Sequence, residues 1–151
     1  AGIGWYTRLE FPYLNNIMEQ GEYVHIEKAG LKIYPEYGTY SDFNALPDSI
    51  FLYIADENNV VTDAVKDYLG KQVQGGKLVK DDLFLGNTYY YFDVTQFMKE
   101  ELGASGKYKH NLQLVFNSDD YTKTLKNLTF SAPNGQNPII LQLNYKIYES
   151  Y

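Results

Sequence analysis

The sequence contains no cysteine, and this absence excludes several kinds of chemistry at once. Disulfide frameworks, thiol nucleophiles, cysteine-rich zinc sites and iron–sulfur clusters all need cysteine sulfur. Histidine is nearly as scarce, because the chain has only His25 and His110. Each lacks a second His or Cys at the spacing of a metal site, so both are interpreted as structural or solvated.

Long apolar runs and an excess of positive charge are also missing. No apolar segment approaches the roughly 20 residues that span a bilayer, and residues 1–4 do not form a basic, then apolar, signal segment. We expect any export signal or lipid anchor to lie upstream, so that the membrane is reached only through that anchor. The 19 Asp and Glu outnumber the 13 Lys and Arg, and the net charge of -6 argues against nucleic acid as a partner.

Tyrosine and phenylalanine, in contrast, are abundant. The chain has 16 Tyr and 8 Phe, and because aromatic side chains favour pleated, half-buried surfaces, this composition favours strands. A length of 151 residues suits one domain, and no internal repeat or linker divides the chain. The prediction is a single sandwich domain over residues 1–151, as a fragment of a longer exported protein.

Alternation of apolar and polar residues predicts strands along most of the chain. In the first of these strands Trp5 is expected on the buried face, and in the last and clearest one Leu143 is expected to point inward. A register shift between Lys28 and Gly30 predicts a β-bulge at a glycine. The expected strands cover residues 3–11, 23–34, 49–55, 89–94, 112–116 and 139–148, with a weaker one at 128–130.

Helices are expected to be few and short. One turn fits residues 12–18, a short helix fits the segment from a Thr62 cap to Gly70, and a two-turn helix follows Asp93 and stops at Gly103. The glycine pair at 75–76 is interpreted as a turn. Short strands separated by turns, with so few helices, predict a sandwich or barrel and not alternating βαβ units.

Five segments of the chain resemble a family of bacterial surface domains. These segments are Tyr91–Thr95 followed by a helix, Asn111–Leu114, Phe130–Ala132, Pro138–Tyr145 and Glu27–Ile33. Together they resemble domain-of-unknown-function family 4270, which is similar to jelly-roll carbohydrate-module-like domains. The resemblance implies an all-β, jelly-roll-like antiparallel β-sandwich with one or two short helices. It also implies an exported lipoprotein on the outer-membrane surface or outside the cell, anchored upstream of this segment.

The candidate ligand-binding residues are aromatic and cluster around a long loop at positions 35–47. They are Tyr34, Tyr37, Tyr40 and Phe43. Aromatic faces flanked by polar groups stack against sugar rings and against protein partners. The competing interpretation is that these side chains pack at the rim of the sandwich with their hydroxyls in water.

Acidic residues are present without a catalytic or metal-binding pattern. Asp93 is expected to cap a helix, and Glu100 and Glu101 are expected to be solvated helix charges, so no pair of glycosidase carboxylates is predicted. Oxygen-rich stretches at 56–59, 81–82 and 118–120 lack the spacing of a calcium loop. No cofactor is expected, and a structural calcium ion is a minor alternative.

The expected function is that of a non-catalytic cell-surface module, which either binds glycans or acts as a structural spacer in a surface lipoprotein. The alternative is an adhesive or assembly subunit. In that case an edge strand, left open because the chain lacks the early strands usual in the family, pairs with another chain. An enzyme is disfavoured, because no nucleophile with a base, metal set or cofactor motif is found.

Overall fold

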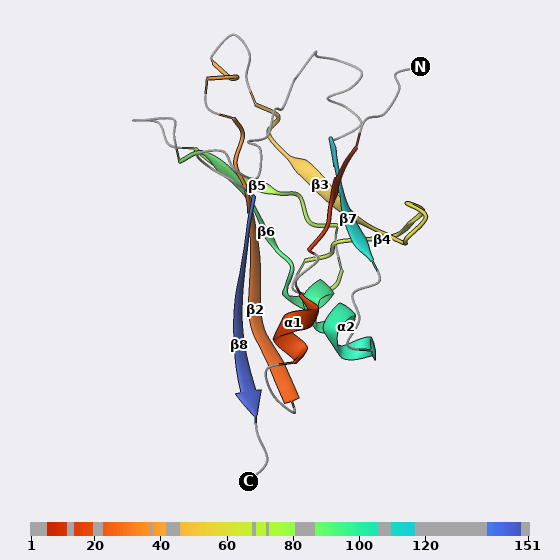
Figure 1. The fold of residues 1–151 in the computed structure, drawn as a ribbon. Helices are drawn as coiled ribbons and strands as arrows, with labels where there is room; N and C mark the ends of the chain where they lie inside the picture. Colours follow the sequence, from red (N-terminus) through yellow and green to blue (C-terminus); the bar gives the residue numbers. More distant parts are fainter. Residues whose placement is uncertain are drawn as a thin grey trace.

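The chain forms two four-stranded antiparallel sheets that face each other (Figure 1). The expected all-β, jelly-roll-like antiparallel sandwich with short helices is therefore confirmed. The computed structural model describes residues 6–11, 14–19, 23–36, 38–41, 46–67, 69–71, 73–80, 87–105, 110–116 and 139–148. Trp5 and the weak strand at 128–130 lie outside these ranges, so their placement stays a prediction.

The two sheets are built by a chain that crosses repeatedly between them. Sheet A has the order β1 (Thr7–Leu9), β7 (Asn111–Phe116), β3 (Ile50–Ala55) and β4 (Val61–Ala64). Sheet B has the order β5 (Lys77–Val79), β6 (Tyr89–Asp93), β2 (Tyr23–Ile33) and β8 (Ile140–Tyr148). Most spatial neighbours are distant in sequence, as expected when Greek-key connections link two sheets.

The hydrophobic core fills the space between the sheets. Every second residue of a strand points into this space, as the period of a pleated strand requires. The buried Tyr90 hydroxyl donates a hydrogen bond to the Pro47 carbonyl, so its polar end is satisfied. Core side chains of the sheets include Leu9, Ala29, Leu31, Ile33, Ile50, Leu52, Tyr90, Phe92, Leu112 and Leu114.

Strands β2 and β8 run on past β6, and two helices lie beside this extension (Figure 1). Helix α1 spans Asn15–Met18, as expected for a single turn, and α2 spans Thr95–Ser105. Phe97, Met98 and Leu102 of α2 belong to the core. Neither helix in the described part of the chain is long and apolar enough to cross a membrane.

The start of α2 agrees with the sequence-based expectation, whereas its end does not. The Asp93 carboxylate accepts a hydrogen bond from the Thr95 backbone N–H at 3.0 Å, which satisfies a donor that the first helical turn leaves free. The helix continues through Gly103 to Ser105, so Gly103 does not end it. A glycine inside a helix costs only about 1 kcal/mol relative to alanine, which packing of the preceding turns can offset.

The last strand, β8, presents its expected inward face. Leu141, Leu143 and Tyr145 are partly buried and pack against the core. Ile147, on the same side, is 40% exposed. The periodicity therefore gave the correct face, but Leu143 is only half-buried.

The helix expected from Thr62 to Gly70 is wrong. Residues 61–64 form β4, which pairs with β3, and Lys66 makes a further bridge with Val73. β-Branched residues such as Val61 and Thr62 fit a strand well. The backbone hydrogen bonds that β3 offers at its edge favour a strand more than the short helical pattern favours a helix. Gly70, with a φ of 68°, instead ends a tight turn in which its N–H donates to the Asp67 carbonyl at 2.8 Å.

The glycine pair at 75–76 is also not a turn, but part of an extended segment that crosses between the sheets. Gly75 bridges to Phe51 of sheet A, and the Gly76 N–H donates to the Ile50 carbonyl at 2.8 Å. Strand β5 of sheet B begins at the next residue. A Cβ atom on Gly76 would overlap the ring of Phe92, so packing, not turn geometry, requires this glycine.

The irregularity in β2 falls earlier than the sequence suggested. The register with β8 shifts between Ile26 and Lys28, so that Glu27 is the extra residue. Gly30 stays in register with both neighbouring strands. Its lack of a side chain instead makes room for an aromatic ring on the outer face of sheet B.

Candidate binding groove

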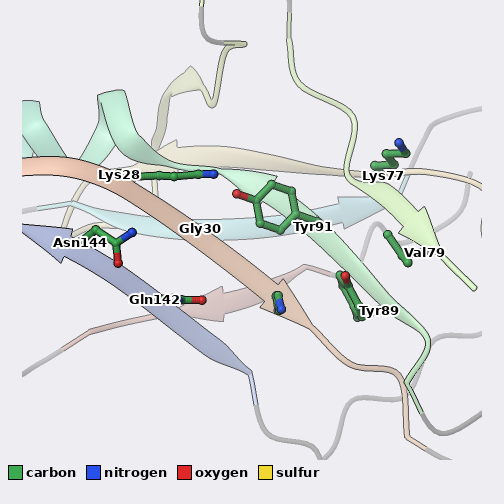
Figure 2. A pocket seen from close by; sticks show the side chains of 9 residues that line it. Lys28, Gly30, Lys77, Val79, Tyr89, Tyr91, Gln142 and Asn144 are labelled. Atoms are coloured by element: carbon green, nitrogen blue, oxygen red, sulfur yellow. The ribbon is translucent and has the colours of Figure 1, made fainter. Parts of the chain in front are cut away.

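The solvent-facing side of sheet B carries a groove with a volume of about 430 Å³. All four strands of the sheet contribute to it, because residues at alternate positions point outward while their neighbours fill the core. We call this feature the sheet B groove (Figure 2). Its lining residues are Lys28, Gly30, Lys32, Lys77, Val79, Tyr89, Tyr91, Gln142 and Asn144.

Tyr91 lies in the middle of this groove. It is directly opposite Lys32 on one neighbouring strand and Lys77 on the other, so the three side chains form one row across the sheet. A Cβ atom on Gly30 would come within 2.9 Å of the Tyr91 hydroxyl oxygen and within 3.0 Å of its ring. The absence of a side chain at Gly30 therefore lets the half-buried Tyr91 ring lie against β2.

A second ring, Tyr89, borders the groove and contacts one of the groove lysines. The Lys32 ammonium lies over this ring, 5.0 Å from its centroid, within the range of a cation–π interaction. On the other side, the ring of Tyr34 packs against Tyr89 with 5.4 Å between centroids and 49° between planes. Tyr34, at the end of β2, thus reaches the groove through Tyr89.

The four aromatic residues expected to bind ligand are placed only in part. Tyr34 and Tyr40 are partly buried, whereas Tyr37 and Phe43 lie outside the described residues. Tyr40 is not among the residues that line the sheet B groove. Sequence analysis missed Tyr91 although its signal was present, because Tyr91 alternates with core residues in a strand that was predicted.

Two amide side chains, Gln142 and Asn144, form the β8 side of the groove. Both are exposed, and neither makes a hydrogen bond within the part of the chain that the structure describes. A side-chain amide offers a carbonyl acceptor and two N–H donors. These two groups are therefore available to hydroxyls of a ligand.

The electrostatic balance of the groove is opposite to that of the chain. Three of its lining residues are lysines and none is acidic, although the whole chain carries a net charge of -6. Asp93 follows on the same strand face, but its carboxylate already accepts the Thr95 N–H and, at 2.6 Å, the Thr95 hydroxyl. The groove is thus a locally positive site on an acidic protein.

Further along β2 and β8, a different lysine is neutralised. The Lys146 ammonium lies 2.6 Å from the Glu27 carboxylate. This hydrogen bond lowers the pKa of Glu27 and raises the pKa of Lys146. The lysines of the groove have no such ion pair with a described residue.

His110 and Glu101 are not among the residues that line the groove. His110 Nδ1 is 2.5 Å from the Glu101 carboxylate, which also accepts the His110 backbone N–H at 3.2 Å. Glu101 is only 9% exposed, so the expectation of a solvated charge is wrong for this residue, whereas Glu100 is exposed as expected. The pair links α2 to the start of β7, and the charge is buried because that side of α2 packs inward.

The oxygen-rich stretch at 56–59 serves a turn. The Asp56 carboxylate accepts the backbone N–H groups of Asn58 and Val60, each at 2.9 Å, as short acidic side chains commonly do in turns. Across the described residues, no group of three or more His, Cys, Asp or Glu could hold a metal ion. The stretches at 81–82 and 118–120 lie outside those residues.

Comparisons of this chain with protein-family models, with curated proteins and with solved structures found no significant match. The chemistry of the sheet B groove is therefore what bears on function. Its rings can stack, its amides can exchange hydrogen bonds and its ammonium groups can attract anions. The lining residues include no carboxylate, imidazole or thiol, whereas the lysines and tyrosines that are present belong to residue types that also act as acids, bases or nucleophiles in enzymes.

Proposed function

We propose that this chain is a non-catalytic binding module that holds a carbohydrate in the sheet B groove. The observation that carries the proposal is the placement of two half-buried tyrosine rings on one open sheet face, beside two amides that make no hydrogen bond within the described residues. The apolar faces of sugar rings pack on aromatic side chains, and sugar hydroxyls exchange hydrogen bonds with amides. Tyr91 supplies the first interaction, beside a Tyr89 ring that already contacts Tyr34 and the Lys32 ammonium. Gln142 and Asn144 supply the second.

The shape of the site favours a polymer over a small molecule. Pockets for small ligands usually enclose most of the ligand surface. The sheet B groove instead lies on the exposed side of a sheet and crosses all four strands, so a chain of sugars can lie across it and extend beyond both edges. A surface lipoprotein, which the family resemblance implies, would present this face to external glycans.

The decisive experiment compares Tyr91→Ala with Tyr6→Ala by affinity electrophoresis in gels that contain soluble polysaccharides. Tyr6 is a matched control, because it is 50% exposed and precedes β1 of the other sheet. Loss of the Tyr91 ring should weaken binding about fivefold, as expected for a stacking contact worth about 1 kcal/mol. The Tyr6 variant should bind normally.

Other outcomes separate the remaining possibilities. Retention that is lost in a Tyr37→Ala, Tyr40→Ala double variant and kept in Tyr91→Ala would move the site to the loop at 35–47. If the unmodified chain is not retained by any polysaccharide, glycan binding is refuted and the structural-spacer role takes its place.

A second candidate function is assembly through β8, and one observation favours it. This nine-residue strand pairs with β2 alone among the described strands, and Ile140, Ile147 and Tyr148 on it are exposed. Long edge strands with apolar residues are templates for pairing with another chain. Light scattering over a concentration series tests this: a mass that rises with concentration supports assembly, and a constant monomer mass rejects it.

A further inference from the structure

The lysines of the sheet B groove are arranged around its central ring. Lys32 and Lys77 flank Tyr91 in the same cross-strand row, and Lys28 lies further along β2, opposite Asn144. Neighbouring strands are about 4.8 Å apart, so Lys32 and Lys77 are anchored roughly 10 Å from each other with the ring between them. A sugar stacked on Tyr91 would have a lysine anchored on the strand to either side.

Within the described residues, these three lysines lack the acidic partners that Lys66 and Lys146 have. Lys71, Lys80 and Lys99 lack them too, so what sets the three apart is that they gather on one sheet face. Lys66 pairs with Asp63 at 3.4 Å and Lys146 with Glu27 at 2.6 Å, whereas Lys28, Lys32 and Lys77 form no ion pair within the described residues. Like charges gathered on one sheet face repel each other and disfavour folding. Three lysines gathered on one sheet face, without an ion pair to a described residue, are therefore better explained by an anionic ligand than by stability.

We infer that the sheet B groove selects acidic polysaccharides, whose sugar units carry carboxylate or sulfate groups that the three lysines contact. This inference rests on the proposed glycan binding and names the class of glycan. Tyr91 would stack on a sugar ring, Gln142 and Asn144 would bind its hydroxyls, and the ammonium groups of the row would meet its charges. Nucleic acid is also a polyanion, and the net charge of -6 repels both classes at long range, so binding of single-stranded DNA is one outcome of the test.

The test compares ligands that share a backbone and differ in charge. Isothermal titration calorimetry and affinity electrophoresis are carried out with polygalacturonate, with its fully methyl-esterified form, with dextran sulfate and with dextran. Each exposed charge pair changes affinity by about two- to fivefold, so loss of the charges should weaken binding about tenfold or more. Preference for polygalacturonate with dextran sulfate inactive assigns carboxylate, and the reverse assigns sulfate.

Matched variants show whether the groove itself provides the selectivity. The triple variant Lys28→Gln, Lys32→Gln, Lys77→Gln should lose about tenfold or more in affinity for the acidic polymer. A control with Lys66→Gln, Lys71→Gln and Lys99→Gln removes the same three charges from exposed positions outside the groove and should bind normally. Thermal unfolding of both variants checks that each remains folded.

Each result has a distinct meaning. Equal binding of the acidic and the esterified polymer, both dependent on Tyr91, overturns the acidic preference and leaves glycan binding intact. Equal losses in the two triple variants, or equally tight binding of poly-glutamate or single-stranded DNA, overturns it as simple charge attraction. No binding to any of the four polysaccharides overturns both proposals.

Discussion

The outer faces of the two sheets carry the same polar groups but use them differently. On sheet A the amides of Asn111 and Gln113 are buried and donate to backbone carbonyls of the β3–β4 turn, at 2.9 Å to Asp56 and 3.1 Å to Asn59. On sheet B the amides of Gln142 and Asn144 are exposed and make no hydrogen bond within the described residues. One face binds its own chain, and the other is open to a ligand.

The difference arises from where the chain turns back. The β3–β4 turn reaches toward β1 and β7, where Arg8 donates to the Asn59 side chain at 2.7 Å. Asn59 adopts a φ of 63°, which asparagine tolerates better than most residues. The comparison teaches that outward polar residues stabilise the fold where a local turn provides their partners. The same residue types become candidate binding groups where the described chain provides none.

The largest loss of stability is expected for a core-facing residue of β6, compared with its outward-facing neighbour. Phe92 is fully buried between the sheets, so Phe92→Ala should lower the free energy of unfolding by about 3–5 kcal/mol. Its neighbour Tyr91 points outward, and Tyr91→Ala should cost clearly less. Urea denaturation measures both, and equal losses would place Tyr91 in the core and not in a binding groove.

The next-largest loss of stability is expected at one of two glycines that make room for aromatic rings. Gly76→Ala forces a methyl group into the buried Phe92 ring and should cost about 1–3 kcal/mol. Gly30→Ala instead meets the ring and hydroxyl end of Tyr91, which can move toward solvent, so its cost in stability should be smaller. Polysaccharide retention should nevertheless fall in Gly30→Ala, since the ring is displaced. Unchanged retention would show that the position of Tyr91 does not matter.

A smaller effect tests the comparison of the two outer faces directly. Gln113→Ala removes a hydrogen bond to the β3–β4 turn and should cost about 1 kcal/mol. Gln142→Ala removes an exposed amide and should change stability by less than about 0.5 kcal/mol, as is usual for surface positions. Thermal unfolding reports on both variants, and a reversed order would contradict the division into a closed and an open face.

The smallest effect on stability is expected for the ion pair between Lys146 and Glu27, next to the groove. The Lys146 ammonium lowers the pKa of Glu27 below its ordinary value of 4.5, so Lys146→Gln should raise that pKa. A carboxyl group with a lowered pKa stabilises the fold above its unfolded pKa, and this contribution is lost as pH falls through the folded pKa. The variant should therefore lose less stability on acidification.

Nuclear magnetic resonance titration of the side-chain carboxyl of Glu27 measures this shift. Asp63 provides the control, because its pKa is lowered first by the Ala64 backbone N–H and only secondarily by Lys66. Lys66→Gln should leave most of the Asp63 shift in place. A Glu27 pKa that does not respond to Lys146→Gln would show that the ion pair is not formed in solution.

Much of the fold was predictable because local periodicity reflects burial. The alternation in residues 89–94 and 139–148 placed Phe92 and Leu143 on inward faces, and the Asp93 cap marked the start of α2. Two of the errors share one cause, which is that a distant strand decided the conformation. Residues 61–64 form a strand because they pair with β3, and the glycine pair at 75–76 is extended because it bonds to the same strand.

The candidate site was predicted less well than the fold. The loop aromatics were chosen because they cluster in the sequence, and of these the structure places Tyr34 against the groove through Tyr89. The groove itself joins residues from four strands, and its outermost members, Lys28 and Asn144, are 116 positions apart, so no local spacing in the sequence indicates it.

By itself, the sequence determined the strand-rich class, the inward faces and the absence of cysteine chemistry, because composition and a period of two depend only on neighbouring residues. The tertiary structure decided which outward residues meet. Strand pairing set Lys32 and Lys77 on either side of Tyr91, and it set Gly30 beneath the ring. Such register is fixed by the whole sandwich closing over one core, a property that no single segment contains.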